Sequence, residues 1–453
     1  MTSAGRPPYE KFYTSPMRVV IVLLIALTVA ISGCGDSDAG TVEPAQTSVP
    51  DKPTPAVTPT AVVEVSTTAE PGAEAISYQN VWISNQFLSL NDSAGGAVLE
   101  EQIASFQADH PELVLNIQGK ATSGSGSILN YLSAGSGIAP SILPDLIMLP
   151  SEELDAAAAQ GIVFPLDGLI EQGMIDDLFP AALNMAQVED TTYGYPFSFS
   201  GMNQLAFDRA TISEEFPEVW DDMMELEDAS FAFPANGRGG AELVLQLYLA
   251  AGGSLVNELN QPVLEVEPLT QALSQINRGV TRRVILRDSG NMTTFDEAWQ
   301  LFSDGDAVIV QTEASQYMDE RESFPDSLPA RIPGYESPLR PLVSGWLWAI
   351  TTEDPARQKL AAELLTTLAS ADTVGDWTLA SGQLPARRSA YENWQIDDPI
   401  TEFYLRASEH AYQFPPEAND SILEALNNAA VQMISLSKSP RSAAEEAAQS
   451  VHP

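Results

Sequence analysis

The sequence Asn80-Val81-Trp82-Ile83 begins the stretch that decides the fold. These residues predict a strand, and the apolar spacing of residues 98–106 then predicts a helix that ends before Pro111. Two further strands are predicted at 113–117 and 146–149, with a short helix between them. Strand, helix, strand, helix, strand in this order predicts an α/β fold with a parallel, doubly wound sheet flanked by helices.

The ends of these strands are where a ligand is expected. In open α/β sheets, ligands collect beyond the carboxyl ends of the strands, where helix N-termini offer free N–H groups. Ser84 and Gln86 follow the first predicted strand, and Ser151 and Glu152 follow the third. The alternative for Ser151 and Glu152 is a structural role, because serine at the cap and acids in the first turn are typical of a helix N-terminus.

The chain after residue 75 is long enough for two lobes. Residues 76–453 exceed what one hydrophobic core usually supports, and they contain no long internal repeat and no second low-complexity segment. Before them, residues 34–75 are rich in Pro, Thr, Ala, Val and Glu and contain no aromatic residue. This composition predicts a disordered tether that precedes a single folded region.

The N-terminal residues predict export. Three basic side chains within residues 1–18 precede the apolar run 19–31, which ends at Ser32-Gly33-Cys34. Such a run is typical of a signal peptide, since a membrane-spanning helix needs about 20 apolar residues. Residues 31–34 look like a bacterial lipobox, so we expect a signal peptide at 1–33 and a lipid anchor on Cys34. An uncleaved anchor and an ordinary secretory signal are the alternatives, and both still place the rest of the chain outside the cytoplasm.

Composition disfavours several classes of function. The chain has 21 Lys and Arg against 62 Asp and Glu, a formal net charge of −41, so its surface repels nucleic acid and anionic lipid headgroups. Cys34 is the single cysteine, which excludes an intramolecular disulfide and a Cys-based metal site. The three histidines are scattered, and phosphate-binding loops and the G-x-S-x-G elbow are absent. We therefore expect no metal, no cofactor and no nucleic-acid partner.

A colinear set of short motifs extends from residue 78 to residue 394. It comprises residues 99–106, 110–112, 139–148, 192–197, 205–208, 247–254, 295–308, 344–350 and 381–386. Each motif alone is weak, but in this order they resemble the bacterial extracellular solute-binding proteins of family 1. That group includes the maltose-binding and other oligosaccharide-binding proteins of ABC importers.

The resemblance implies a two-lobed periplasmic-binding-protein-like fold of type II, with hinge-joined lobes that close on a solute. The chain is expected to leave the first lobe near 196–200, to return near 295 and to cross again near 342–344. The first lobe then comprises about 76–196 and 296–341, and the second about 197–295 and 342–453.

The resemblance also implies a function. We expect an extracytoplasmic, lipid-anchored monomer that captures a small polar solute, such as a sugar or oligosaccharide, and delivers it to the permease subunits of an ABC importer. Two alternatives stay open, a secreted hydrolase acting on carbohydrate and a sensor or adhesin that uses the same cleft without a transporter. Nothing in the spacing of the acids selects the carboxylate pair that a glycosidase requires, so we expect a binding protein and not an enzyme.

A sugar site needs carboxylates, amides and hydroxyls around stacked aromatic rings. Trp346 is expected as a stacking platform, with a core tryptophan as the alternative. Trp348 shares its face if residues 344–350 form a strand, and one of the two can then belong to the core.

Further candidates come from the segments that face the expected cleft. Phe197, Ser200 and Asn203 flank the first crossing, where Ser200-Gly201 offers no charged anchor. Thr312 and Glu313 follow the predicted strand 307–311, and Glu313 either binds sugar hydroxyls or is merely solvated. Gln383 in the late loop 381–385 completes the candidates.

Overall fold

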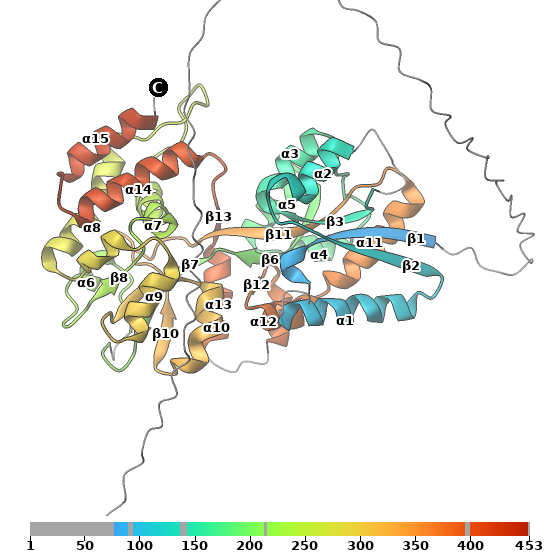
Figure 1. The fold of residues 1–453 in the computed structure, drawn as a ribbon, viewed down its shortest axis with the longest axis horizontal. Coiled ribbons are helices and arrows are strands. Elements are labelled where there is room, and N and C mark those ends of the chain that lie inside the picture. The colour runs from blue at the N-terminus through green and yellow to red at the C-terminus, as the bar shows by residue number, and fades with distance from the viewer. Residues whose placement is uncertain (1–76, 89–93, 136–142, 213–214, 395–398, 452–453) are drawn as a thin grey trace, which may run out of the picture. The chain divides into compact units, whose positions relative to one another are not determined.

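The computed structural model describes residues 77–88, 94–135, 143–212, 215–394 and 399–451. The predicted signal peptide, Cys34 and the predicted tether lie outside these residues. Residues 70–453 form one compact unit (Figure 1). Within the described residues it contains two larger sheets, a small two-stranded sheet and two main hydrophobic cores, and the two larger sheets give the two-lobed α/β architecture that the sequence predicts.

The larger sheet belongs to the first lobe. Its order is β12-β6-β11-β3-β1-β2, and β13 pairs with the start of β11. The predicted parallel unit is present, because β1 pairs in parallel with both β2 and β3. β11 runs antiparallel to β3 and to β6. The bounds are β1 (Ser77–Ser84), β2 (Leu113–Lys120), β3 (Leu146–Pro150), β6 (Gly194–Ser200), β11 (Leu342–Ile350), β12 (Leu384–Pro385) and β13 (Tyr412–Gln413).

Helices cover both faces of this sheet because its strands are apolar on both sides. Leu146 and Met148 of β3 pack into the main core, whereas Ile147 and Leu149 pack into a smaller cluster on the opposite face. The first face is covered by α1 (Ala94–Asp109), α5 (Pro180–Ala186), α11 (Pro355–Leu368) and α12 (Ala371–Ser381). The second face is covered by α2 (Ile128–Gly135) and α3 (Leu154–Ala159). The short elements α4 (Gln172–Asp176), β4 (Gln187–Val188) and β5 (Thr191–Thr192) complete this part of the chain.

The smaller sheet belongs to the second lobe and has the order β10-β7-β9-β8. Its strands are β7 (Asn203–Asp208), β8 (Phe231–Ala232), β9 (Ile309–Glu313) and β10 (Ser327–Ala330). One face packs on α7 (Arg238–Ala250), α8 (Val266–Arg282), α14 (Asp420–Ile434) and α15 (Pro440–Val451). The other face packs on α9 (Phe295–Ser303), α10 (Ala314–Glu320) and α13 (Pro399–His410), and α6 (Trp220–Met223) lies at the edge near β8.

Three segments connect the two sheets. The chain passes from β6 to β7 through Gly201, whose φ of 65° is a left-handed conformation that favours glycine. It returns between β10 and β11, and it crosses a third time after β13 on the way to α14. The second and third crossings are joined, because the amide of Tyr412 donates to the Pro341 carbonyl at 2.8 Å.

The expected lobe boundaries need correction. Residues 296–341 were expected in the first lobe, but β9 lies between β7 and β8 in the smaller sheet, so no return occurs near Phe295. Residues 342–453 were expected in the second lobe, but β11 lies between β6 and β3 in the larger sheet, whereas the helices α13, α14 and α15 do pack against the second lobe. Strand pairing between distant segments, which no local pattern encodes, decides both assignments.

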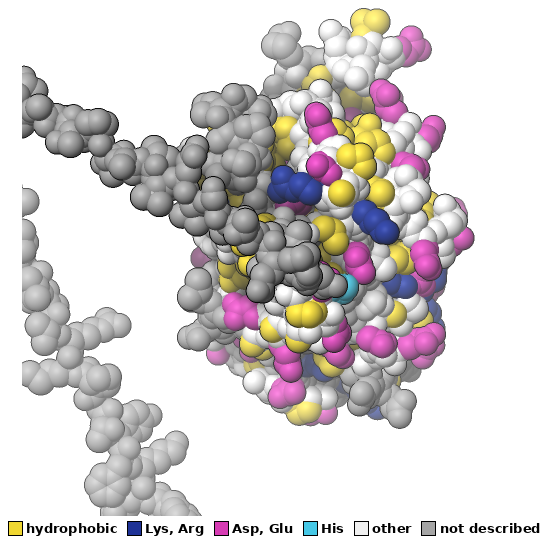
Figure 2. All heavy atoms as spheres, turned by 90° about the vertical axis from the view of Figure 1, so that its right-hand side faces the viewer, with side chains coloured by type: hydrophobic (Ala, Val, Ile, Leu, Met, Phe, Trp, Pro, Cys, Tyr) yellow, Lys and Arg dark blue, Asp and Glu magenta, His cyan; other side chains and the backbone are white. Residues whose placement is uncertain are grey.

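Acidic side chains are scattered over the surface. The face in Figure 2 carries many Asp and Glu side chains and few Lys and Arg, in keeping with the net charge of −41. In the part of the chain that the structure describes, no helix is long and apolar enough to cross a membrane.

Candidate functional site

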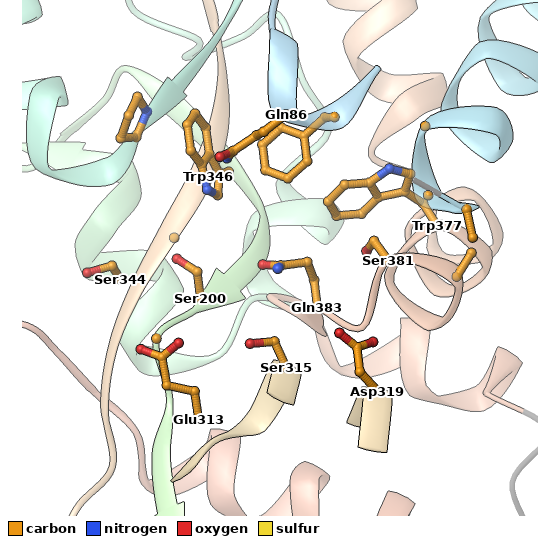
Figure 3. A pocket seen from close by; sticks show the side chains of 18 of the residues that line it. Gln86, Ser200, Glu313, Ser315, Asp319, Ser344, Trp346, Trp377, Ser381 and Gln383 are labelled. Atoms are coloured by element: carbon orange, nitrogen blue, oxygen red, sulfur yellow. The ribbon is translucent and has the colours of Figure 1, made fainter. Parts of the chain in front are cut away.

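A cavity of about 680 Å³ is lined by residues of both lobes (Figure 3). Its size falls within the range of small-molecule sites. The lining residues are Gln86, Phe87, Ala94, Gly95, Gly96, Pro150, Glu152, Ser200, Gly201, Arg238, Glu313, Ser315, Asp319, Ser344, Gly345, Trp346, Trp377, Ala380, Ser381 and Gln383.

The first-lobe wall of this cavity is aromatic. Phe87 lies edge-on to Trp346, with ring centroids 4.9 Å apart, and edge-on to Trp377 at 5.4 Å. The three rings therefore form one cluster in which Phe87 separates two indoles. Trp346 and Trp377 are nearly buried, so these rings are fixed by packing before any solute arrives.

Backbone packing fixes the position of Trp346. The preceding Gly345 leaves no room for a side chain, since a Cβ there would lie 2.8 Å from the Ser198 carbonyl oxygen. The Gly345 amide donates a hydrogen bond to the hydroxyl of Ser151 at 3.1 Å. The pairing of β11 with β6 also shifts register between Trp346 and Leu347. The loop after β3 and the register shift in β11 together fix the backbone at Trp346.

The second-lobe wall carries charged side chains. Glu313 ends β9, Ser315 and Asp319 lie one turn apart on α10, and Arg238 begins α7. Figure 3 shows the carboxylates of Glu313 and Asp319 on the side of the cavity opposite the two indoles. Burial raises the pKa of the Glu313 carboxyl, and nearby Arg238 offsets part of this rise. Burial, and then Glu320, raises the pKa of Asp319.

Hydroxyl and amide groups lie between the two walls. Ser200, Ser344 and Ser381 present hydroxyls, and Gln86 and Gln383 present amides. The Gln383 Oε1 is buried and, within the described residues, accepts no hydrogen bond. A buried acceptor without a partner is costly, and a donor group on a solute would satisfy it. The cavity therefore offers stacking surfaces, acceptors and donors, which is what a polyhydroxylated ring requires.

Six of the predicted site residues line this cavity. They come from six separate segments of the chain and from both lobes, and they are Gln86, Glu152, Ser200, Glu313, Trp346 and Gln383.

The other six predicted residues do not line the cavity. Their side chains are buried, and their partners are residues of the protein. The hydroxyl of Ser84 lies 2.9 Å from that of Thr122, Ser151 holds Gly345, Phe197 packs on Trp348, Asn203 donates to Glu242, and Thr312 donates to Gln316 at 2.6 Å.

One expectation about β11 is confirmed, and one about the loop after β3 is wrong. Trp346 and Trp348 do share a face of β11, but Trp348 is 1% exposed and belongs to the core. Ser151 was considered as a helix cap, but its side chain caps no helix and instead bonds to β11. A serine hydroxyl satisfies either partner equally well, and only the long-range pairing of β3 with β11 decides between them.

The sequence analysis missed several cavity residues. A signal existed for two pairs, because residues four apart share a helix face. Trp377 and Ser381 lie one turn apart on α12, just before the predicted Gln383. Ser315 and Asp319 lie one turn apart on α10, just after the predicted Glu313. No comparable signal marked Arg238, which reaches the cavity from a helix far along the chain.

In the ranges that the structure describes, no group of three or more His, Cys, Asp or Glu side chains is placed to hold a metal ion.

Comparison with known proteins relates this geometry to a family and to solved folds. Residues 101–402 match the protein family described as "Bacterial extracellular solute-binding protein". The GacH receptor of Streptomyces glaucescens, solved unliganded and with acarbose, is 18% identical with a TM-score of 0.60, and the match covers 83% of this chain and 97% of that chain. A comparison with curated proteins gives no match.

Two further solved structures have a similar fold. The cyclic alpha-maltosyl-1,6-maltose binding protein of Arthrobacter globiformis is 15% identical with a TM-score of 0.66, and the match covers 83% of this chain and 97% of that chain. The sugar-binding protein MalE of Xanthomonas citri is also 15% identical with a TM-score of 0.66, over 83% and 96% of the two chains. At these identities the likeness shows the fold.

Proposed function

Because the chain belongs to the bacterial extracellular solute-binding proteins, we propose that it captures an oligosaccharide in the cavity between its lobes and delivers it to an ABC importer. The members of this family are binding proteins rather than enzymes. The structural neighbours bind acarbose and a cyclic maltosyl-maltose, which makes α-linked glucose oligomers the first candidates for the solute.

The observation that carries the proposal is the pairing of fixed indoles with unpaired polar groups in one cavity. Sugars present a C–H face that stacks on aromatic rings and hydroxyls that bond to amides and carboxylates. Trp346 offers such a ring, while Gln383 and Glu313, which lie below it in Figure 3, offer acceptors. A volume of about 680 Å³ accommodates more than a single sugar ring.

Capture requires that the solute shifts an equilibrium between open and closed arrangements of the lobes. A solute that contacts residues of both lobes favours the closed arrangement, since only there are both sets of contacts made. The importer then recognises the closed form. The predicted anchor on Cys34 and the predicted tether 34–75 would keep the protein at the outer face of the membrane, within reach of the permease.

A thermal-shift screen tests the proposal directly. A protein comprising residues 70–453, the compact unit with its own cores, is melted with maltose, maltotriose, cellobiose, xylobiose, amino acids and polyamines. A saccharide that binds only the folded state raises Tm. We expect the largest rise with maltotriose, and a rise with polyamines or amino acids alone would contradict the proposal.

A matched pair of amide deletions locates the site. Gln383→Ala removes a cavity amide and should reduce the shift with maltotriose. Gln271→Ala removes an exposed amide on α8 and should leave the shift unchanged. Prolonged incubation should return the saccharide intact, and shorter products would favour the hydrolase alternative.

A further inference from the structure

Among the described residues that line the cavity, Arg238 is the one with a basic side chain. Hydrogen bonds to the loop before it fix the position of its backbone. Arg238 is the first residue of α7, and the loop before it is tied to α14, because the Asn427 amide donates to the carbonyls of Ala235 and Gly237 at 3.0 and 2.9 Å. The Arg238 side chain is 58% exposed, so its guanidinium is open to the cavity.

A buried carboxylate holds one edge of this guanidinium. Glu242 lies one turn further along α7, its side chain is 2% exposed, and it accepts a hydrogen bond from the Nε of Arg238. Burial raises the pKa of Glu242, and Arg238 offsets part of this rise. A buried carboxylate with so few partners contributes little to stability compared with an apolar side chain. Its contact with Arg238 points to a role in the cavity.

Asn203 is the third member of the cluster. It is the first residue of β7, 2% exposed, and its Nδ2 donates to the Glu242 carboxylate. In register it lies opposite Glu313 on β9. Two residues earlier is Gly201, where a Cβ would lie 3.3 Å from the Nη2 of Arg238. The cluster therefore connects α7 to the segment where the chain crosses between the lobes.

We propose that Glu242 and Asn203 are positioning residues that hold the Arg238 guanidinium so that its Nη groups donate to solute hydroxyls from the second lobe. Within the described residues, Arg238 uses only its Nε for hydrogen bonding, which leaves the paired Nη donors available. A planar guanidinium that is fixed at one edge presents two parallel donors, which match the adjacent hydroxyls of a sugar. The proposal rests on the oligosaccharide function and adds the recognition device of the second lobe.

A double-mutant cycle separates positioning from general stability. In the wild-type background Glu242→Gln should weaken maltotriose binding about tenfold, since a charge-assisted bond is lost while the side-chain volume is kept. In the Arg238→Ala background the same change should have no further effect. Equal losses in both backgrounds, or no loss in the wild type, would overturn the proposal.

The chain offers a matched control for this substitution. Arg441 and Glu445 form a second pair four residues apart near the start of α15, and both are exposed. Glu445→Gln therefore breaks the same kind of contact outside the cavity and should leave maltotriose affinity unchanged.

A measurement without sugar keeps the proposal testable on its own. In NMR spectra of arginine side chains, the Nε–H of Arg238 should exchange with water more slowly than that of Arg441, because the Glu242 partner is buried and Glu445 is not. Glu242→Gln should remove the difference. If no saccharide binds, the proposed function fails, and rapid exchange at Arg238 in the wild type would overturn the positioning role independently.

Discussion

The two walls of the cavity are built from different chemistry. The first-lobe wall presents Trp346, Phe87 and Trp377, which are packed against one another and against the core. The second-lobe wall presents Arg238, Glu313 and Asp319, which are charged and more exposed to solvent. Under the proposed function, we expect one wall to stack on the faces of a sugar ring and the other to bond to its edges.

The difference suggests a separate role for each wall in solute binding and lobe closure. Stacking on preformed rings depends on apolar contact and is insensitive to salt and pH, whereas bonds to charged groups depend on both. Under the proposed function, we therefore expect a solute to be held on the aromatic wall before closure and to gain contacts with the charged wall when the lobes approach. Perturbations of the two walls should give distinguishable responses.

The largest expected effect is on the aromatic wall. Trp346→Ala should weaken maltotriose binding by about 2 kcal/mol, roughly 30-fold, because it removes a fixed stacking surface. Titration calorimetry at low and high salt should show the same loss under both conditions. Trp346→Phe keeps a ring and should recover most of the affinity. A loss that disappears in high salt would contradict the assignment of this wall to stacking.

A smaller effect is expected on the charged wall. Glu313→Gln should weaken maltotriose binding by about 1 kcal/mol, roughly fivefold, because a charged acceptor becomes a neutral one. Burial raises the pKa of Glu313, so wild-type affinity should fall toward that of the variant as pH falls through this raised pKa.

An exposed acid outside the cavity provides the control for this prediction. Glu424 on α14 is exposed and does not line the cavity, so Glu424→Gln should leave both the affinity and its pH dependence unchanged. Identical pH profiles for the wild type and Glu313→Gln would show that the Glu313 carboxylate does not contact the solute.

The smallest effect concerns the protein without sugar. Burial raises the pKa values of Glu313, Asp319, Glu153 and Asp145, so the folded state binds protons at a higher pH than the unfolded chain does. The free energy of unfolding should therefore rise as pH falls from 7 toward 5, by about 0.5 kcal/mol after allowance for solvent screening. Urea denaturation at pH 7, 6 and 5 measures this slope.

The cavity acids account for part of that slope. The double variant Glu313→Gln with Asp319→Asn should show a shallower rise than the wild type. An unfolding free energy that falls over the same range would mean that these carboxyls are stabilised as anions in the folded state.

Local patterns predicted the fold well where the strands are close in sequence. The run from β1 to β3 carries its own periodicity, and the structure confirms the parallel sheet there. The lobe assignment of residues 296–453 was wrong in several parts, because β9 pairs with β7, and β11 with β3 and β6, across more than a hundred residues of sequence. Periodicity reports which face of an element is buried and carries no information about its partner.

Several of the predicted residues that line the cavity were found because they lie near the ends of predicted strands. Gln86, Glu152 and Glu313 lie at the end of a strand or two residues beyond it, and they line the cavity. Asn203 and Ser84 also lie at strand ends, but their side chains turn inward to partners that only the tertiary structure brings near. Arg238 was missed because its approach depends on how α7 packs across the second lobe.

The position of β11 determines when the protein can fold. It lies between β3 and β6 at the centre of the larger sheet, and α14 and α15 complete the core of the second lobe. Neither lobe therefore has all of its parts until the last quarter of the chain has been synthesised. Contacts over such long separations slow folding. A chain that stays unfolded until its C-terminal residues emerge is well suited to transport across a membrane in the extended state.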